Sequence, residues 1–104
     1  MTHWEDIIAK RTEERHRRAL AAWGWLEAEM LSLNVKPTLF GSLAKERFMA
    51  HSDIDVTVDL NGNAAARVLV EQAVARACRR WSVPVDLLFE DDLSDENLAL
   101  LHAS

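Results

Sequence analysis

The sequence predicts a small α/β (α+β) domain in which a small mixed β-sheet is flanked by helices and a long helix comes first. Two observations predict this class. Apolar residues recur every three or four positions in the first third of the chain, and the period changes to two near residue 53. At 104 residues the chain can build one hydrophobic core but not two, so we expect a single domain over residues 1–104.

A long first helix is predicted from Trp4 to about Leu33, because this stretch contains no proline and only one glycine. Its apolar stripe consists of Leu20, Trp23, Leu26, Met30 and Leu33. Pro37 disfavours helical geometry at the residue before it, which predicts the end of the helix. A short strand at 38–40 should then lead into Gly41.

A half-buried strand is predicted from residue 53 to residue 60. The residues Ile54, Val56, Val58 and Leu60 alternate there with Asp53, Asp55, Thr57 and Asp59. Side chains two positions apart on a strand share a face. The carboxylates of Asp53 and Asp55 should therefore lie on the same side of the sheet.

The remaining elements follow from local signals. Residues 61–63 predict a turn with a helix cap, and residues 64–81 predict a helix with Val70, Val74, Ala77 and Trp81 on one side. Residues 83–89 predict a third strand. Ser94 is a suitable cap for a short last helix that ends near His102, and the acidic residues around it are expected to form a solvated turn and helix start.

Composition excludes several classes of function. The net charge of −5 provides no general basic surface, so we expect no direct contact with nucleic acid, and any bound polyanion would need a local site. The single cysteine, Cys78, cannot form an intramolecular disulfide, and no apolar run approaches 18 residues. Without a signal-like start either, we expect a cytoplasmic protein that does not bind a membrane.

Three carboxylates are the first candidate site. Asp86 interrupts an otherwise apolar strand, and the 31 residues that separate it from Asp55 allow one helical crossover between neighbouring strands. Asp86 could thus lie beside Asp53 and Asp55. Carboxylates gathered in this way repel unless a cation neutralises them, and carboxylate oxygens with open positions suit Mg²⁺ that also binds substrate phosphates.

Gly41 and Ser42 are the second candidate site. A glycine at a strand end lets backbone N–H groups approach a phosphate, the turn after it can form an anion-binding nest, and the serine hydroxyl is a further donor. Alone, a Gly-Ser pair usually marks only a turn, and an Asp-x-Asp pair is more often a strand-end feature than a metal site. The combination with Asp86 favours a functional interpretation.

Together these residues resemble the signature of the minimal nucleotidyltransferases of the DNA polymerase beta superfamily. That signature is Gly-Ser, about ten residues, Asp-x-Asp and a third carboxylate on a later strand, matched here by Gly41, Ser42, Asp53, Asp55 and Asp86. The resemblance covers roughly residues 38–90. The common pattern has Arg-Gly where this chain has Lys45 and Glu46, with Arg47 one step later.

The resemblance implies a polymerase-beta-like nucleotidyltransferase fold and transfer of a nucleoside monophosphate from an NTP. Asp53 and Asp55 would bind two Mg²⁺ ions, and Asp86 would complete the metal site that activates the acceptor hydroxyl. Gly41 and Ser42 would hold the β and γ phosphates of ATP. Lys45 or Arg47 could add positive charge there, although both are equally typical of a solvated loop.

So small a chain has little beyond a catalytic sheet, so its acceptor surface should come from another protein. The size resembles the antitoxin half of toxin–antitoxin pairs whose partner is a helical HEPN-domain ribonuclease toxin. The resemblance then implies a hetero-oligomer in which AMP is transferred from ATP to a tyrosine hydroxyl of the toxin. Two alternatives stay open: an antitoxin that acts by contact alone, and a transferase whose acceptor is a small molecule such as an antibiotic.

Overall fold

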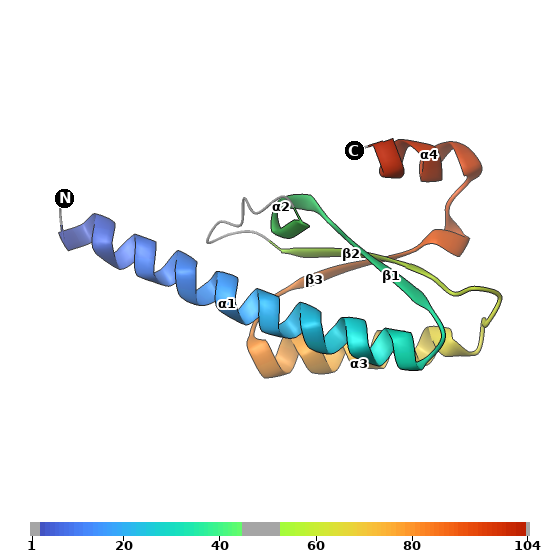
Figure 1. Cartoon of the computed structure of the whole chain (residues 1–104), viewed down its shortest axis with the longest axis horizontal. Helices are drawn as coiled ribbons and strands as arrows, with labels where there is room; N and C mark the ends of the chain where they lie inside the picture. The colour runs from blue at the N-terminus through green and yellow to red at the C-terminus, as the bar shows by residue number, and fades with distance from the viewer. Residues whose placement is uncertain (1–2, 45–52, 104) are drawn as a thin grey trace.

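A computed structural model of the chain describes residues 3–44 and 53–103. The elements follow in the order α1 (His3–Ser32), β1 (Lys36–Phe40), α2 (Gly41–Ala44), β2 (Ile54–Asp59), α3 (Ala66–Trp81), β3 (Val85–Phe89), the 3₁₀ turn η1 (Glu90–Asp92) and α4 (Asp95–Ala103). Figure 1 shows three layers: α1 and α3 side by side, the sheet, and α4 on the other side of the sheet. The predicted α+β class with a long N-terminal helix and a small mixed sheet is confirmed.

The sheet has three strands in the order β1-β2-β3. β1 pairs with β2 in the antiparallel direction and β2 pairs with β3 in the parallel direction. The parallel pair requires a crossover, which α3 provides, as the spacing between Asp55 and Asp86 predicts. Pro37 is tolerated in β1 because β1 lies at an edge of the sheet.

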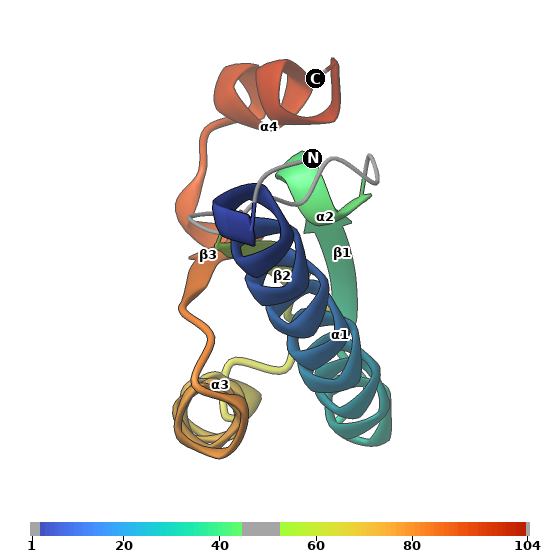
Figure 2. The ribbon, with the colours of Figure 1, turned by 90° about the vertical axis from the view of Figure 1, so that its left-hand side faces the viewer.

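The core lies between the sheet and the two helices α1 and α3. The predicted alternation of β2 is confirmed except at Thr57: Ile54, Val56 and Val58 are buried and Asp55 and Asp59 are not, but Thr57 is also buried. From α3, Val70, Val74 and Ala77 are buried as expected, and Trp81 packs at the margin of the core. Figure 2 shows the same layers from the end of α1.

Three predicted details of the helices are wrong. The buried stripe of α1 starts at Ala19, one position before the predicted start at Leu20, and Leu20 is 49% exposed. The stripe consists of Ala19, Ala22, Leu26 and Met30. α1 ends before the proline can act, because Asn34 takes a left-handed conformation (φ 62°) and the Val35 N–H donates to the Met30 carbonyl at 3.2 Å. The helix α3 starts at Ala66, and no side chain caps it.

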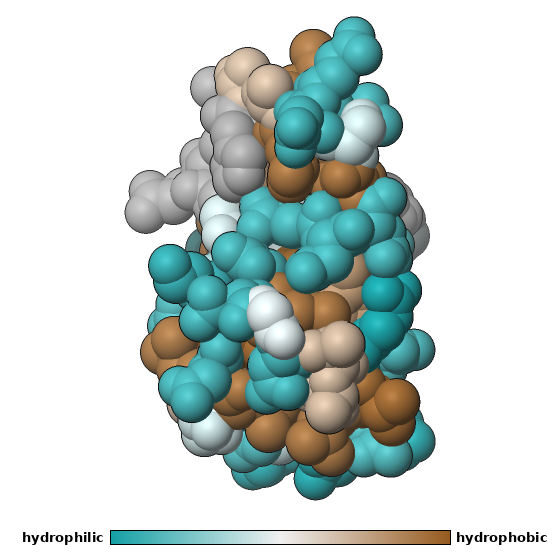
Figure 3. Space-filling model, turned by 90° about the vertical axis from the view of Figure 1, so that its right-hand side faces the viewer, coloured by the Kyte–Doolittle hydropathy of each residue, from teal (hydrophilic) through white to brown (hydrophobic). Residues whose placement is uncertain are grey.

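α1 is much longer than the sheet. Thirty residues at 1.5 Å per residue give about 45 Å, and its N-terminal half extends past the other elements (Figure 1). No residue from Trp4 to Arg18 is fully buried, and Trp4 is 66% exposed. The surface at the opposite end of the molecule mixes hydrophobic and hydrophilic side chains (Figure 3).

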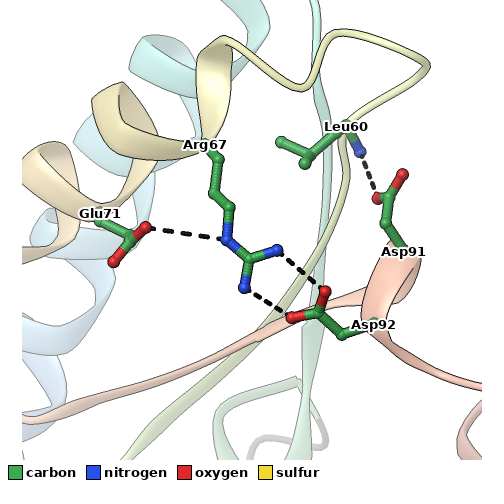
Figure 4. Close-up of polar contacts among 5 residues, drawn as sticks. All are labelled: Leu60, Arg67, Glu71, Asp91 and Asp92. Atoms are coloured by element: carbon green, nitrogen blue, oxygen red, sulfur yellow. Dashed lines mark hydrogen bonds and ion pairs between the residues drawn. The ribbon is translucent and has the colours of Figure 1, made fainter.

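The end of the sheet distant from α1's N-terminus is fixed by a polar clamp of Arg67, Asp91 and Asp92 (Figure 4). Two N–H groups of the Arg67 guanidinium donate to the two oxygens of Asp92 at 2.9 and 2.6 Å. The Leu60 N–H donates to Asp91 Oδ1 at 3.1 Å. The acidic segment was expected to be a solvated turn, but its carboxylates join η1 to α3 and to the end of β2. Ser94 caps α4 as predicted, because its hydroxyl accepts a hydrogen bond from the Asn97 N–H.

Candidate active site

The candidate active site lies on the face of the sheet opposite α1 and α3. Phe40 of β1 pairs with Asp55 of β2, and Asp55 in turn pairs with Asp86 of β3. Paired residues on neighbouring strands point to the same face of a sheet. One side chain from each strand is thereby brought to the same level on this open face.

Asp86 is close enough to Asp55 to affect its ionisation. The pKa of Asp55 is raised above its ordinary value of 3.8, first by partial burial and then by the negative charges of Asp86 and Asp53. A hydrogen bond between the Asp55 and Asp86 carboxyl groups raises it further. The Asp55 carboxyl group therefore holds its proton more tightly than an isolated aspartate would.

Asp53 stands just before the first residue of β2 and is half-buried. Its charge reaches Asp55, as the pKa of Asp55 shows. Within residues 3–44 and 53–103, however, no three His, Cys, Asp or Glu side chains are clustered tightly enough to hold a metal ion. The structure therefore brings Asp55 and Asp86 together with Asp53 nearby, and the three-carboxylate metal site stays a prediction.

The donor set nevertheless suits Mg²⁺. Asp55 and Asp86 offer hard oxygen ligands side by side, and burial together with the charges of Asp86 and Asp53 raises the pKa of Asp55. A divalent cation would relieve the repulsion between these charges. Asp53, just before β2, is the third carboxylate within reach of this pair.

Gly41 is in direct contact with Asp55. It opens the short helix α2 with φ of 73°, a conformation that glycine adopts without strain. A Cβ at this position would collide with Asp55 Oδ2 and lie 3.2 Å from Asp55 Cγ. The glycine thus leaves room for the carboxylate as well as for any phosphate, a role that sequence reasoning alone did not identify.

Ser42 follows Gly41 in the backbone of α2, so the turn predicted after Gly41 is a short helical one. The two candidate phosphate-binding cations, Lys45 and Arg47, lie outside the described residues. The arrangement brings the start of α2 and the carboxylates to the same region, because α2 packs against β2.

A hollow of about 460 Å³ lies between the open face of the sheet and α4. Its lining combines the carboxylates of Asp55 and Asp86 with apolar side chains, of which Phe40, Leu88 and Leu101 come from three different elements. This volume falls within the range of small-molecule sites. The contribution of α4 could not be predicted from sequence, because its helical pattern does not say which face of the sheet it covers.

Thr57 is a second residue that sequence reasoning missed. It lines the hollow at 2% exposure, and its hydroxyl has no hydrogen-bond partner among the described residues. A buried hydroxyl without a partner is costly, so a water or a ligand group in the hollow that bonded to it would stabilise the site. The signal in the sequence was its position two residues after Asp55, on the same face.

One comparison with known proteins, against protein families, agrees with the fold. Residues 10–101 match the family described as the nucleotidyltransferase domain, well over half of the chain. No curated protein and no solved structure matches the chain. None of the helices in the described part of the chain combines the length and the hydrophobicity needed to cross a membrane. With its mixed three-stranded sheet, its long first helix and this match, the chain belongs to the nucleotidyltransferase domain family.

Proposed function

We propose that the chain transfers AMP from ATP to a tyrosine hydroxyl of a helical HEPN-type ribonuclease toxin and thereby acts as its antitoxin. Membership of the nucleotidyltransferase domain family supports nucleotide transfer in general. The observation that carries the proposal to this site is the pairing of Asp55 with Asp86 on the open face of the sheet, beside Gly41.

Different residues of the site take different steps of the nucleotide transfer. The acceptor oxygen attacks the α-phosphorus of ATP, the bond from that phosphorus to the bridging oxygen breaks, and pyrophosphate leaves. Asp86 is exposed on β3 and takes the proton of the acceptor hydroxyl. Backbone N–H groups at the start of α2 orient the phosphates, with Gly41 leaving them space. Bound Mg²⁺ would supply charge neutralisation for the pyrophosphate and lower the pKa of the acceptor hydroxyl.

The hollow beneath α4 supports an aromatic acceptor. Phe40, Leu88 and Leu101 provide apolar walls, and the carboxylates lie at the same site. A tyrosine ring would bury its apolar faces there while its hydroxyl reached Asp86. The chain itself contains no tyrosine, so modification of that residue type takes place on another protein.

Two features support a protein partner. Trp4 and Ile8 expose apolar surface on the projecting half of α1, where they contact little of the chain itself. The net charge of −5 also favours approach to a basic, RNA-cutting partner, since opposite fields accelerate association.

Intact-mass spectrometry of the chain copurified with the toxin tests the proposal. With ATP and Mg²⁺ the partner should gain about 329 Da for each AMP added, which is AMP less water, and this chain should gain nothing. The Asp55→Asn chain is the control and should leave the partner unmodified. Inhibition of the toxin without added mass would establish a contact-only antitoxin.

The size of the hollow also suits a small-molecule acceptor, which is the second candidate function. Incubation of the chain alone with labelled ATP and a panel of hydroxyl-bearing compounds distinguishes the two. Transfer to a compound without any partner protein would replace the protein-acceptor proposal.

A further inference from the structure

A second hollow, of about 380 Å³, lies between α1 and α3 on the side of the sheet away from Asp55. We call it the Trp–Arg hollow, and its lining is Trp25, Arg76, Arg79, Arg80 and Trp81. The two indole rings meet at a centroid distance of 5.8 Å, tilted by 50°. No residue of the candidate active site contributes to it.

Guanidinium groups lie over both rings. The Arg80 guanidinium carbon is 4.5 Å from the Trp81 ring centroid, and that of Arg76 is 5.8 Å from the Trp25 centroid. The rings restrict these long side chains to one region, which lowers the entropy that ligand binding would otherwise cost. Flat cationic groups are thereby arranged in advance at the surface.

Fold stability does not account for all three arginines. Arg79 and Arg80 lie in the last turn of α3, where positive charge is favourable, but Arg76 lies a full turn earlier. Arg76 stands three and four positions before the other two, so like charges are neighbours on the helix surface. None of the three forms an ion pair with a residue of 3–44 or 53–103.

The lining of the hollow offers donors and ring faces but no carboxylate. Three guanidinium groups and two indole N–H groups donate, and none of the lining side chains is a good acceptor. The hollow also continues along α3 into a neighbouring one of about 360 Å³, which Gln72, Ala75, Arg76 and Arg79 line. From residue 72 to residue 81 this groove runs about 14 Å, enough for several linked units of a polymer.

We propose that the Trp–Arg hollow and its continuation along α3 bind single-stranded nucleic acid. Phosphates would take the guanidinium donors, and bases would stack on the indole and guanidinium planes. An acidic peptide would satisfy the arginines but leave the ring faces unmatched, so the mixture of rings and cations favours the nucleic acid. With a net charge of −5 on the whole chain, binding would be confined to this groove.

Fluorescence anisotropy of a labelled single-stranded RNA octamer at several salt concentrations tests the proposal. Three phosphate contacts predict a slope of log K against log[salt] of about −2, at about −0.7 for each contact. The double variant R76Q/R79Q should reduce the slope to about −0.7. Trp81→Leu should weaken binding about tenfold through lost stacking.

The matched control is R11Q/R17Q, which removes two exposed arginines from α1 and should leave the slope unchanged. Circular dichroism and thermal unfolding verify that each variant is folded, and the arginine variants decide the matter if Trp81→Leu is not. Absence of salt-dependent binding would overturn the proposal. So would an equal loss in the control variant, or competition by polyglutamate of the same length as effective as that by unlabelled RNA.

Discussion

Asp55 lies at the centre of the predicted site residues. Gly41 adjoins it, and Asp86 shares a hydrogen bond with it. Burial, followed by the charges of Asp86 and Asp53, raises the pKa of Asp55 above its ordinary value. For a carboxyl group, a raised folded-state pKa means that stability falls as the pH rises from the ordinary value of 3.8 through the folded value.

Asp55→Asn should therefore separate stability from activity. At pH 7 and without metal, the variant should have a melting temperature equal to or above that of the wild type, because one of the repelling charges is gone. Nucleotide transfer should fall by about a hundredfold or more, the loss expected for removing a metal ligand. Melting curves and a transfer assay measure the two effects. A variant with full Mg²⁺-dependent activity would remove Asp55 from the mechanism.

Gly41→Ala should affect both stability and activity, unlike Asp55→Asn. The new methyl group collides with the Asp55 side chain, and φ of 73° is unfavourable for alanine. We expect a loss of about 1–3 kcal/mol in the free energy of unfolding and a displaced Asp55 carboxylate. Denaturant unfolding measures the loss in the free energy of unfolding, and ATP titration calorimetry measures the effect on nucleotide binding. Gly24→Ala is the control, since nothing lies within 4 Å of its added Cβ and its helix favours alanine.

At the scale of elements, sequence periodicity was sufficient to predict the helices and strands. It was not sufficient to predict which of their side chains pack against one another. The alternation around Val56 predicted β2 correctly, because one packed face and one polar face leave a clear period of two. The start of the α1 stripe was misplaced because alanines such as Ala19 and Ala22 pack where the helices approach closely, and their small size hides them among exposed residues.

The acidic segment after β3 shows what a linear pattern could not reveal. Asp91 and Asp92 read as solvated charges, since their partners Leu60 and Arg67 are more than 20 positions away. Long-range pairs of this kind leave no periodic signal. The pairing of Asp55 with Asp86 could be proposed, because the length of the crossover indicates neighbouring strands. The place of Thr57 in the hollow could not, because the sequence does not show that α4 covers this face of the sheet.

The ion pair between Arg67 and Asp92 predicts that the stability of the fold decreases at acid pH. The hydrogen bonds from Arg67 hold the pKa of Asp92 below its ordinary value of 3.8. A lowered carboxyl pKa stabilises the fold above 3.8, and that contribution is lost as the pH falls through the folded value. The melting temperature of Asp92→Asn should be lower than that of the wild type at pH 6, and the difference should shrink when the pH is lowered below 3.8. A difference that stays constant over this pH range would show that the ion pair contributes nothing.

The whole molecule is elongated, with principal extents of 53, 29 and 15 Å, because α1 extends beyond the core. Its two halves should respond differently to mutation. Leu26 is fully buried against the sheet, and Leu26→Ala should cost about 2–5 kcal/mol of the free energy of unfolding. Trp4 and Ile8 contribute little to the fold.

The double variant W4A/I8A should therefore keep the wild-type unfolding free energy to within about 0.5 kcal/mol. If the projecting half of α1 contacts the toxin, the variant should lose binding to the copurified partner by at least about tenfold. Chemical denaturation and surface plasmon resonance measure the two quantities. Leu20→Ala, a change at another exposed apolar position of α1, is the control for general loss of hydrophobic surface.

The position of β3 at the edge of the sheet has a practical consequence for Asp86. The outer edge of β3 leaves backbone N–H and C=O groups that a strand from another molecule could pair with, and its neighbour Leu88 is 48% exposed. A charged side chain on an edge strand disfavours such pairing, so we expect Asp86 to oppose edge-to-edge association. Asp86→Asn would remove that protection together with the proposed base. An inactive Asp86→Asn preparation is therefore informative only if light scattering shows it free of aggregates.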